Sequence, residues 1–110
     1  MIIFQGYATK LIGDPVLQGQ NVRAGILMKA MGNTHRLRIL CLLLEGEKSV
    51  RHLEEEVGLS QSALSQHLAR LRRGRLVKTR RVAQNIFYSL LGHETEAVLA
   101  VLTELYGPLN

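Results

Sequence analysis

Apolar residues recur at every third or fourth position over much of the chain, a pattern that predicts helices. The clearest stripe is Leu64, Leu68 and Leu71, in a segment that begins at the N-cap residue Ser60 and ends near Gly74. Glycine suits the left-handed position that follows a helix, so we expect Gly74 to occupy it. The face opposite the leucines carries small, amide and basic side chains and no acid, so this helix is expected to have one buried and one polar side.

Periodicity and end signals predict further helices on both sides of this segment. The expected ranges are 16–31, 34–44, 49–57 and 94–106. The helix over 34–44 is apolar around most of its circumference, which is typical of a buried central helix. Residues 1–15 are expected to form an irregular arm, and residues 108–110 a short tail. The residues between them, 16–107, are expected to form a single domain.

The period changes from about four to two after Gly74, which predicts strands over 76–82 and 85–90 joined at Ala83 and Gln84. A short helix, a turn containing Gly58 and a polar-faced helix form the helix-turn-helix pattern. The hairpin that follows would be a wing beside the polar-faced helix. The expected fold class is therefore mainly α with a small β-hairpin wing, a winged helix-turn-helix.

The distribution of charge indicates the kind of partner. The chain has 110 residues and a net charge of +5, yet no Asp or Glu lies between Val57 and His93, where half of its 14 basic residues are found. A basic run can be an ordinary solvated face, but a long run of one sign favours a phosphate-binding surface. We therefore expect double-stranded DNA as the partner.

The polar face of the helix after Ser60 supplies the candidates for reading DNA bases. Glutamine can pair with adenine through two hydrogen bonds, and serine can bond to most base edges. An ordinary solvated helix face is the alternative. For His67, which lies beside the leucine stripe, local packing is the alternative. The expected base contacts are Gln61, Ser62, Ser65, Gln66 and His67.

A second group of residues is expected to contact phosphates or to form the wing. Such contacts position a protein on DNA without reading the sequence. For Arg36, a plain surface charge is an equally good interpretation. The residues are Ser60, Arg36, Arg70, Arg73, Lys78, Arg80, Arg81, Gln84 and Asn85.

The first and last predicted helices carry apolar stripes that a small winged core would leave uncovered. Packing against a second copy would bury them, so we expect a homodimer. The alternative is that both stripes fold back on their own core. The expected interface residues are Val22, Ile26, Ala30, Val98, Val101, Leu102 and Leu105.

Several motifs together resemble the ArsR/SmtB family of bacterial winged-helix repressors. They are MKAMGN at 28–33, RLRIL at 36–40, LSQSALSQHL at 59–68, LVKTRR at 76–81 and FYSL at 87–90. The resemblance covers residues 22–107 and includes the branch of BigR-, SqrR-, HlyU- and NolR-like regulators. It implies a homodimer of five-helix subunits, with the hairpin before the last helix, that represses transcription until an effector releases it.

The resemblance also limits the effector. In the redox-responsive branch a cysteine in the second helix pairs with one near the end of the last helix. Cys41 matches the first, but Gly107 stands at the second position, so that dithiol is not available. Cys41 is then either a small core residue or a sensing thiol. Metal-sensing members carry thiols where this chain has residues 50–55, or Asp and His where it has Gly92 and Glu94, so no metal or cofactor is expected.

Other function classes have little support in the sequence. No catalytic triad, phosphate-binding glycine loop or paired-carboxylate cleft is present, so no enzyme is expected. The longest apolar run, residues 39–44, is too short to span a membrane, and a single cysteine fits a reducing cytoplasm. The sequence predicts a cytoplasmic, sequence-specific repressor that binds a pseudo-palindromic operator. A winged-helix protein-interaction module and a repressor with a non-standard metal site are the alternatives.

Overall fold

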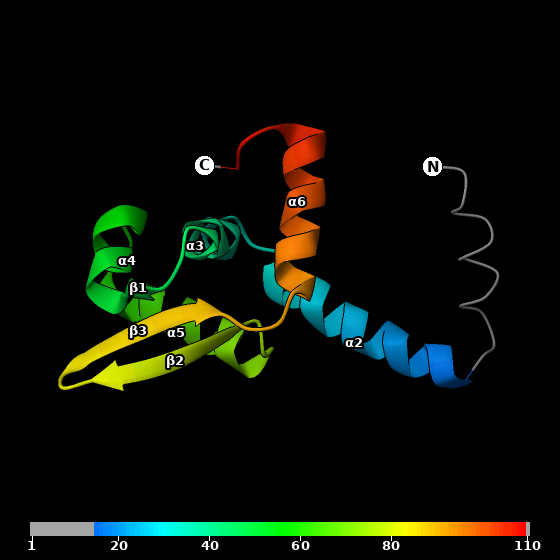
Figure 1. Ribbon diagram of the computed structural model, residues 1–110, viewed down its shortest axis with the longest axis horizontal. Coiled ribbons are helices and arrows are strands. Elements are labelled where there is room, and N and C mark those ends of the chain that lie inside the picture. Colours follow the sequence, from blue (N-terminus) through cyan, green and yellow to red (C-terminus); the bar gives the residue numbers. More distant parts are fainter. Residues whose placement is uncertain (1–14, 110) are drawn as a thin grey trace.

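Helix α3 (Thr34–Leu44) lies in the middle of the fold, with the other elements arranged around it (Figure 1). The computed structural model describes residues 15–109, and side chains from residue 19 onward. The predicted arm over 1–15 lies outside this range except for Pro15, the first residue of α2. The remaining elements are α2 (Pro15–Met31), β1 (Lys48–Ser49), α4 (Val50–Val57), α5 (Gln61–Arg73), β2 (Val77–Val82), β3 (Asn85–Leu90) and α6 (Glu94–Tyr106).

The core confirms the central place of α3. Ile39 and Leu40 are 0% exposed, because α4, α5, α6 and the sheet pack on different sides of this helix. The leucine stripe of α5 is buried against it, as its spacing predicts. Leu109 also packs against the core, so part of the predicted tail is attached to the domain. The other fully buried side chains include Leu53, Leu64, Leu68, Leu71, Leu76, Val77 and Leu99.

The sheet has one more strand than the sequence predicts. The hairpin is confirmed, with Val82 opposite Asn85 and a two-residue turn that begins at Ala83, whose φ is 55°. β1 pairs antiparallel with the free edge of β3 and gives the strand order β1-β3-β2. Two residues carry no alternation that a sequence pattern could detect. The strand forms because the edge of β3 offers unpaired backbone groups.

The expected conformation of Gly74 is wrong. Its φ is −77°, and the left-handed position belongs to Arg75, whose φ is 62°. The amide of Leu76 donates to the Leu71 carbonyl and that of Arg75 to the Arg72 carbonyl, both at 3.0 Å. This is the Schellman arrangement of hydrogen bonds that closes many helices. It is displaced here by one residue from the glycine.

Packing explains why a glycine stands at position 74. A Cβ at Gly74 would lie 3.2 Å from the Cβ of Ala30 on α2 and 3.1 Å from Cδ1 of Leu76. A side chain at position 74 would require Ala30 or Leu76 to shift by a few tenths of an ångström. The glycine therefore favours this close contact between helices.

We predict opposite effects of substitution at these two neighbouring positions. Arg75→Gly removes a side chain from a left-handed conformation and should stabilise the fold by about 1 kcal/mol. Gly74→Ala should destabilise it by about 1–2 kcal/mol, because the added methyl group overpacks the contact with α2. Urea unfolding of the two variants measures both changes. Stabilisation by Gly74→Ala would contradict the packing explanation.

Candidate nucleic-acid interface

Two features fix the position of α5. The Ser60 hydroxyl accepts a hydrogen bond from the backbone amide of Ala63 at 3.2 Å, which confirms the predicted N-cap. Leu64, Leu68 and Leu71 are at most 2% exposed. Since successive residues are rotated by about 100° around a helix, burial of this stripe determines which side chains point away from the protein.

The predicted base-reading side chains are on the outer face of α5. Gln61, Ser62, Ser65 and Gln66 are all exposed. Arg70 and Arg73, also exposed, continue this surface toward the end of the helix. Amide and hydroxyl groups therefore occupy the first turns and guanidinium groups the last ones. A helix with such a face can present hydrogen-bonding groups to base edges and positive charge to phosphates.

His67 lies at the inner edge of this surface. It is half-buried, and its Nδ1 is 3.3 Å from Nη1 of Arg36 on α3. Its ring is also 5.6 Å from the ring of His35, centroid to centroid. Burial, reinforced by the charges of Arg36 and His35, holds the pKa of His67 below its usual value. The structure therefore contains the local packing of His67 that the sequence analysis gave as the alternative to a base contact.

Arg36 is neither a surface charge nor placed to contact phosphate, so both interpretations of it are wrong. Only 8% of the residue is exposed. Its Nε donates to the carbonyl of Ala30 at 2.6 Å and its Nη2 to that of Lys29 at 3.4 Å. The last carbonyls of a helix have no partner within the helix and attract cations. Arg36 therefore closes the end of α2.

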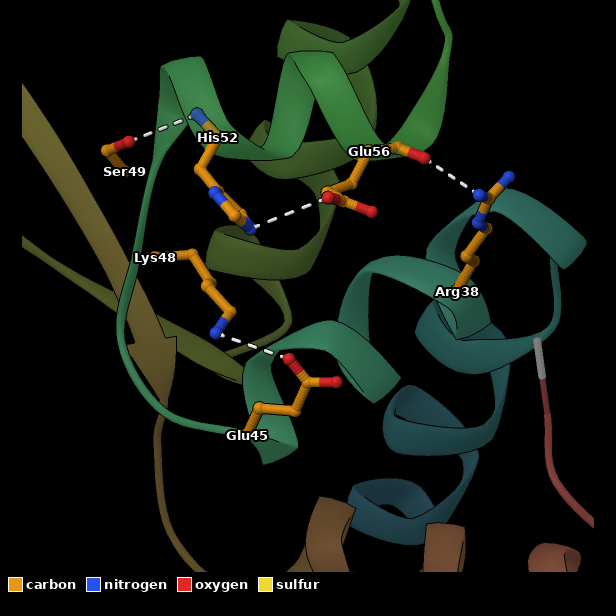
Figure 2. Close-up of polar contacts among 6 residues, drawn as sticks. All are labelled: Arg38, Glu45, Lys48, Ser49, His52 and Glu56. Atoms are coloured by element: carbon orange, nitrogen blue, oxygen red, sulfur yellow. Dashed lines mark hydrogen bonds and ion pairs between the residues drawn. The ribbon is translucent and has the colours of Figure 1, made fainter.

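A side chain makes a hydrogen bond to the backbone at each end of α4, the first helix of the helix-turn-helix (Figure 2). At its start, the Ser49 hydroxyl accepts a hydrogen bond from the amide of His52 at 3.0 Å. At its end, Nη2 of Arg38 on α3 donates to the Glu56 carbonyl at 2.7 Å. Gly58 follows with a φ of 73°, which confirms its predicted place in the turn. The bond from Arg38 joins the end of α4 to α3, just before the turn that leads to α5.

The basic residues of the wing are divided between its two faces. Alternation along β2 places Arg81 on the same face as the buried Val77, and Lys78 and Arg80 on the other. Gln84 lies in the turn at the tip and is exposed, as is Asn85. The wing therefore presents positive charge on both sides of the tip.

Arg80 is not a free cation, contrary to expectation. Its Nη2 and Nε donate to the two carboxylate oxygens of Glu47, at 2.6 and 3.1 Å, and its guanidinium lies 4.9 Å from the centre of the Phe87 ring. Hydrogen bonding to Arg80 lowers the pKa of Glu47. The acid-free window in the sequence is interrupted in space, because β1 pairs with β3 and the carboxylate of the preceding residue, Glu47, reaches Arg80 on β2.

Most of the predicted dimer face is exposed in the single chain. Val22 and Ile26 on α2 are 63% and 50% exposed, and Val101 and Leu105 on α6 are 53% and 68% exposed. Ala30 is different: it is 5% exposed and belongs to the chain's own core, so its assignment to the interface is wrong. The other two expected residues, Val98 and Leu102, are half-buried against that core.

Comparison with known proteins identifies the family. Residues 33–79 match the family described as "Bacterial regulatory protein, arsR family". The transcriptional activator HlyU of Vibrio cholerae is 49% identical over 94 residues, which cover 86% of this chain and 87% of HlyU. The chain belongs to the ArsR family. Its fold class, a winged helix-turn-helix, is confirmed by the solved structures that it resembles.

Two other members of the ArsR family extend the comparison. The nodulation protein NolR of Rhizobium meliloti is 49% identical over 86 residues, covering 78% of this chain and 70% of NolR. The structure of the transcriptional repressor BigR from Xylella fastidiosa superposes with a TM-score of 0.77 at 33% identity, over 82% of this chain and 92% of that one. These relatives belong to the branch that the motifs indicate.

Cys41 has the environment of a core residue within this ArsR-family fold. It is half-buried on α3, and burial raises the pKa of its thiol, which keeps the sulfur protonated and poorly nucleophilic. The chain has no second cysteine with which to form a disulfide. Its environment thus favours the small core residue over the sensing thiol.

Residues 15–109 contain neither a metal-binding cluster nor a membrane-spanning helix. Within this range, no three His, Cys, Asp or Glu side chains lie close enough together to hold a metal ion. None of the helices described there has the length and apolar character needed to cross a membrane.

Two side-chain contacts that the sequence did not reveal join distant parts of the chain. Arg36 and His67 are 31 residues apart, and Glu47 and Arg80 are 33 residues apart. The short strand β1, which brings Glu47 to the wing, has no sequence signal. Only the end of α2 offered a hint, because a helix that stops at Met31 leaves carbonyls for a nearby cation to satisfy.

We predict that Glu47→Gln frees Arg80 to contact phosphate. Affinity for duplex DNA should rise, and the slope of log K against log salt should steepen by about 0.9 for one added phosphate contact. The matched control is Glu96→Gln, which removes an acid from the first turn of α6, outside the wing. Titrations at several salt concentrations measure both slopes. A weaker affinity in Glu47→Gln would instead mean that the ion pair presents Arg80 to DNA.

Proposed function

We propose that this ArsR-family protein represses transcription by binding a pseudo-palindromic operator as a homodimer, with α5 of each subunit in a major groove. The chain is a DNA-binding transcriptional regulator, as its family and relatives show. The observation that carries the proposal is the outer face of α5, which is exposed, acid-free and held in place by its buried leucines. Residues 16–107 would act as one DNA-binding and dimerisation domain.

The side chains of α5 divide into two roles in this proposal. Gln61, Ser62, Ser65 and Gln66 would contact base edges, because they are exposed and can both donate and accept hydrogen bonds. His67 would support this surface from its inner edge instead of reading a base. Discrimination between sequences would then rest on the first two turns of the helix.

Contacts to phosphate would come from both sides of the reading face. On α5, Ser60 lies at the helix N-terminus, which attracts anions, and Arg70 and Arg73 lie in its last turns. On the wing, the exposed side chains of Lys78, Arg81, Gln84 and Asn85 would reach the neighbouring backbone. Arg80 would join them only where it leaves Glu47.

The dimer would form through α2 and α6, which both lie on the far side of α3 from the wing tip (Figure 1). Val22, Ile26, Val101 and Leu105 would be covered by the partner, and the half-buried Val98 and Leu102 would lie beneath them. A two-fold axis there would separate the two reading helices by about 34 Å, one turn of DNA. Symmetry of the protein would then be matched by a pseudo-palindrome in the DNA.

We propose that the protein represses transcription and does not activate it. BigR, one of the relatives, is described as a transcriptional repressor, whereas HlyU is described as an activator. A dimer that covers its operator would block access to the promoter without further contacts. The site of action would be the cytoplasm, where bacterial DNA lies.

We predict that Gln66→Ala and Arg81→Ala weaken DNA binding in different ways. Loss of a base contact at Gln66 should reduce discrimination by about 1–3 kcal/mol at one base pair, with little effect on random DNA. Loss of a phosphate contact at Arg81 should weaken binding to all sequences and lower the salt slope by about 0.9. Competition titrations with selected and scrambled duplexes measure both. Equal losses on both duplexes for both variants would contradict these roles.

We predict that Val101→Glu prevents dimer formation, because it places a charge in the apolar face of α6. Val82→Glu is a matched control, since Val82 on the wing is 45% exposed and Val101 is 53% exposed. Sedimentation equilibrium should give a dimer for the wild type and Val82→Glu and a monomer for Val101→Glu. A dimer in all three proteins would place the interface elsewhere.

A further inference from the structure

We propose that Arg36 and His67 form a proton-sensitive positioning pair that holds α5 in its reading orientation, so that protonation of His67 lowers selectivity for the operator. This inference rests on the proposed function of α5. It concerns two residues that the sequence suggested as DNA contacts and that the structure instead places against each other.

A single guanidinium joins three helices. Arg36 projects from the first turn of α3, donates through Nε to the Ala30 carbonyl and through Nη2 to the Lys29 carbonyl at the end of α2, and reaches Nδ1 of His67 on α5 through Nη1. Because α2 also carries part of the proposed dimer face, the guanidinium connects that face with the reading helix. The hydrogen bond to Ala30 is buried, so water competes poorly for it, and the bonds to Lys29 and His67 are partly buried.

The contact requires a neutral imidazole. Arginine has only donors, so Nδ1 of His67 must be the acceptor and the ring proton must sit on Nε2. A second proton would turn Nδ1 into a donor. The hydrogen bond would be lost, and two cations would face each other at 3.3 Å.

The surroundings offer nothing to stabilise the protonated ring. Arg36 and His35 from α3 act on the ring, and Arg70, three positions further along α5, acts on Arg36. α2 meets Arg36 through backbone carbonyls. No acid among residues 15–109 makes an ion pair or hydrogen bond with His67. The lowered pKa of His67 agrees with this arrangement.

The direction of the pH effect follows from that lowered pKa. A histidine whose pKa is lower in the folded protein than in the unfolded chain contributes stability above its unfolded value, about 6.5. This contribution is lost as pH falls below that value and through the folded pKa. The α3–α5 contact is therefore intact at neutral pH and is released as the pH falls through the folded pKa of His67, which lies below its usual value.

Release of the contact would affect base reading through the adjacent residue, Gln66. His67 follows Gln66, a proposed base contact, and precedes Arg70 by one turn on the same helix. A change in the seating of α5 at this point would move base-reading groups more than it would alter the total positive charge. The effect should therefore appear in selectivity, the ratio of affinities for operator and scrambled DNA.

The test compares His67→Asn with the wild type. The Asn side-chain oxygen can take the place of Nδ1 as acceptor but does not titrate, so the variant should keep the contact at all pH values. His93→Asn is the control, because His93 is 86% exposed and lies outside this cluster. The probe is a duplex that the wild type selects from a random library at about pH 7.5, measured against its scrambled counterpart.

We expect the selectivity ratio of the wild type and of His93→Asn to fall about tenfold between about pH 7.5 and about pH 5.5, and that of His67→Asn to stay constant. Arg36→Lys, which keeps the charge but cannot make all three contacts, should have a low ratio throughout. Identical pH profiles for the wild type and His67→Asn would overturn the proposal.

A measurement on the wild type alone covers the case in which a variant fails to fold. NMR titration of the imidazole nitrogens should show Nε2 protonated at neutral pH and a pKa for His67 below its usual value. A usual or raised pKa would overturn the proposal. If the wild type has no salt-sensitive preference for the selected duplex at about pH 7.5, the proposed function itself fails, which separates the two conclusions.

Discussion

Burial of the leucine stripe on α5 determines which groups this protein can offer to DNA. Leu64, Leu68 and Leu71 are at most 2% exposed, and replacing such a leucine by alanine costs about 2–5 kcal/mol. Rotation of α5 by one residue, about 100°, would expose that stripe and turn Gln66 toward the core. Apolar packing on one side of α5 thus holds its polar face outward. The orientation of that face depends on the stability of the core around α3.

Several cations that a charge count would assign to DNA are used inside the protein. Arg36 and Arg38, both on α3, bond to the last carbonyls of α2 and α4, and Arg80 pairs with Glu47. These arginines fix the helices that carry the reading surface. The positive charge left for phosphate lies mainly at the end of α5 and on the wing, as at Arg73 and Arg81. Whether an arginine has a structural or a DNA-binding role therefore depends on the groups that its side chain can reach.

The sequence was sufficient wherever an interaction is local. Ser60, Gly58 and the hairpin turn were all predictable, because caps and turns depend on residues a few positions apart. It was insufficient where packing between distant segments decides the outcome. Gly74 looked like a left-handed residue but is favoured by the close approach of α2, and Arg75 takes the strained conformation instead. The pairing of Arg36 with His67 had no local signal for the same reason, because the two residues meet only after α3 and α5 have packed.

The central claim is that two copies of α5 enter successive major grooves on one face of a duplex. Hydroxyl-radical footprinting of the wild-type protein on a selected duplex tests it most directly. Two α5 helices in successive major grooves should give two protected stretches whose centres lie about 10 base pairs apart, related by the two-fold symmetry of the site. A single protected stretch, or uniform protection along the duplex, would contradict it.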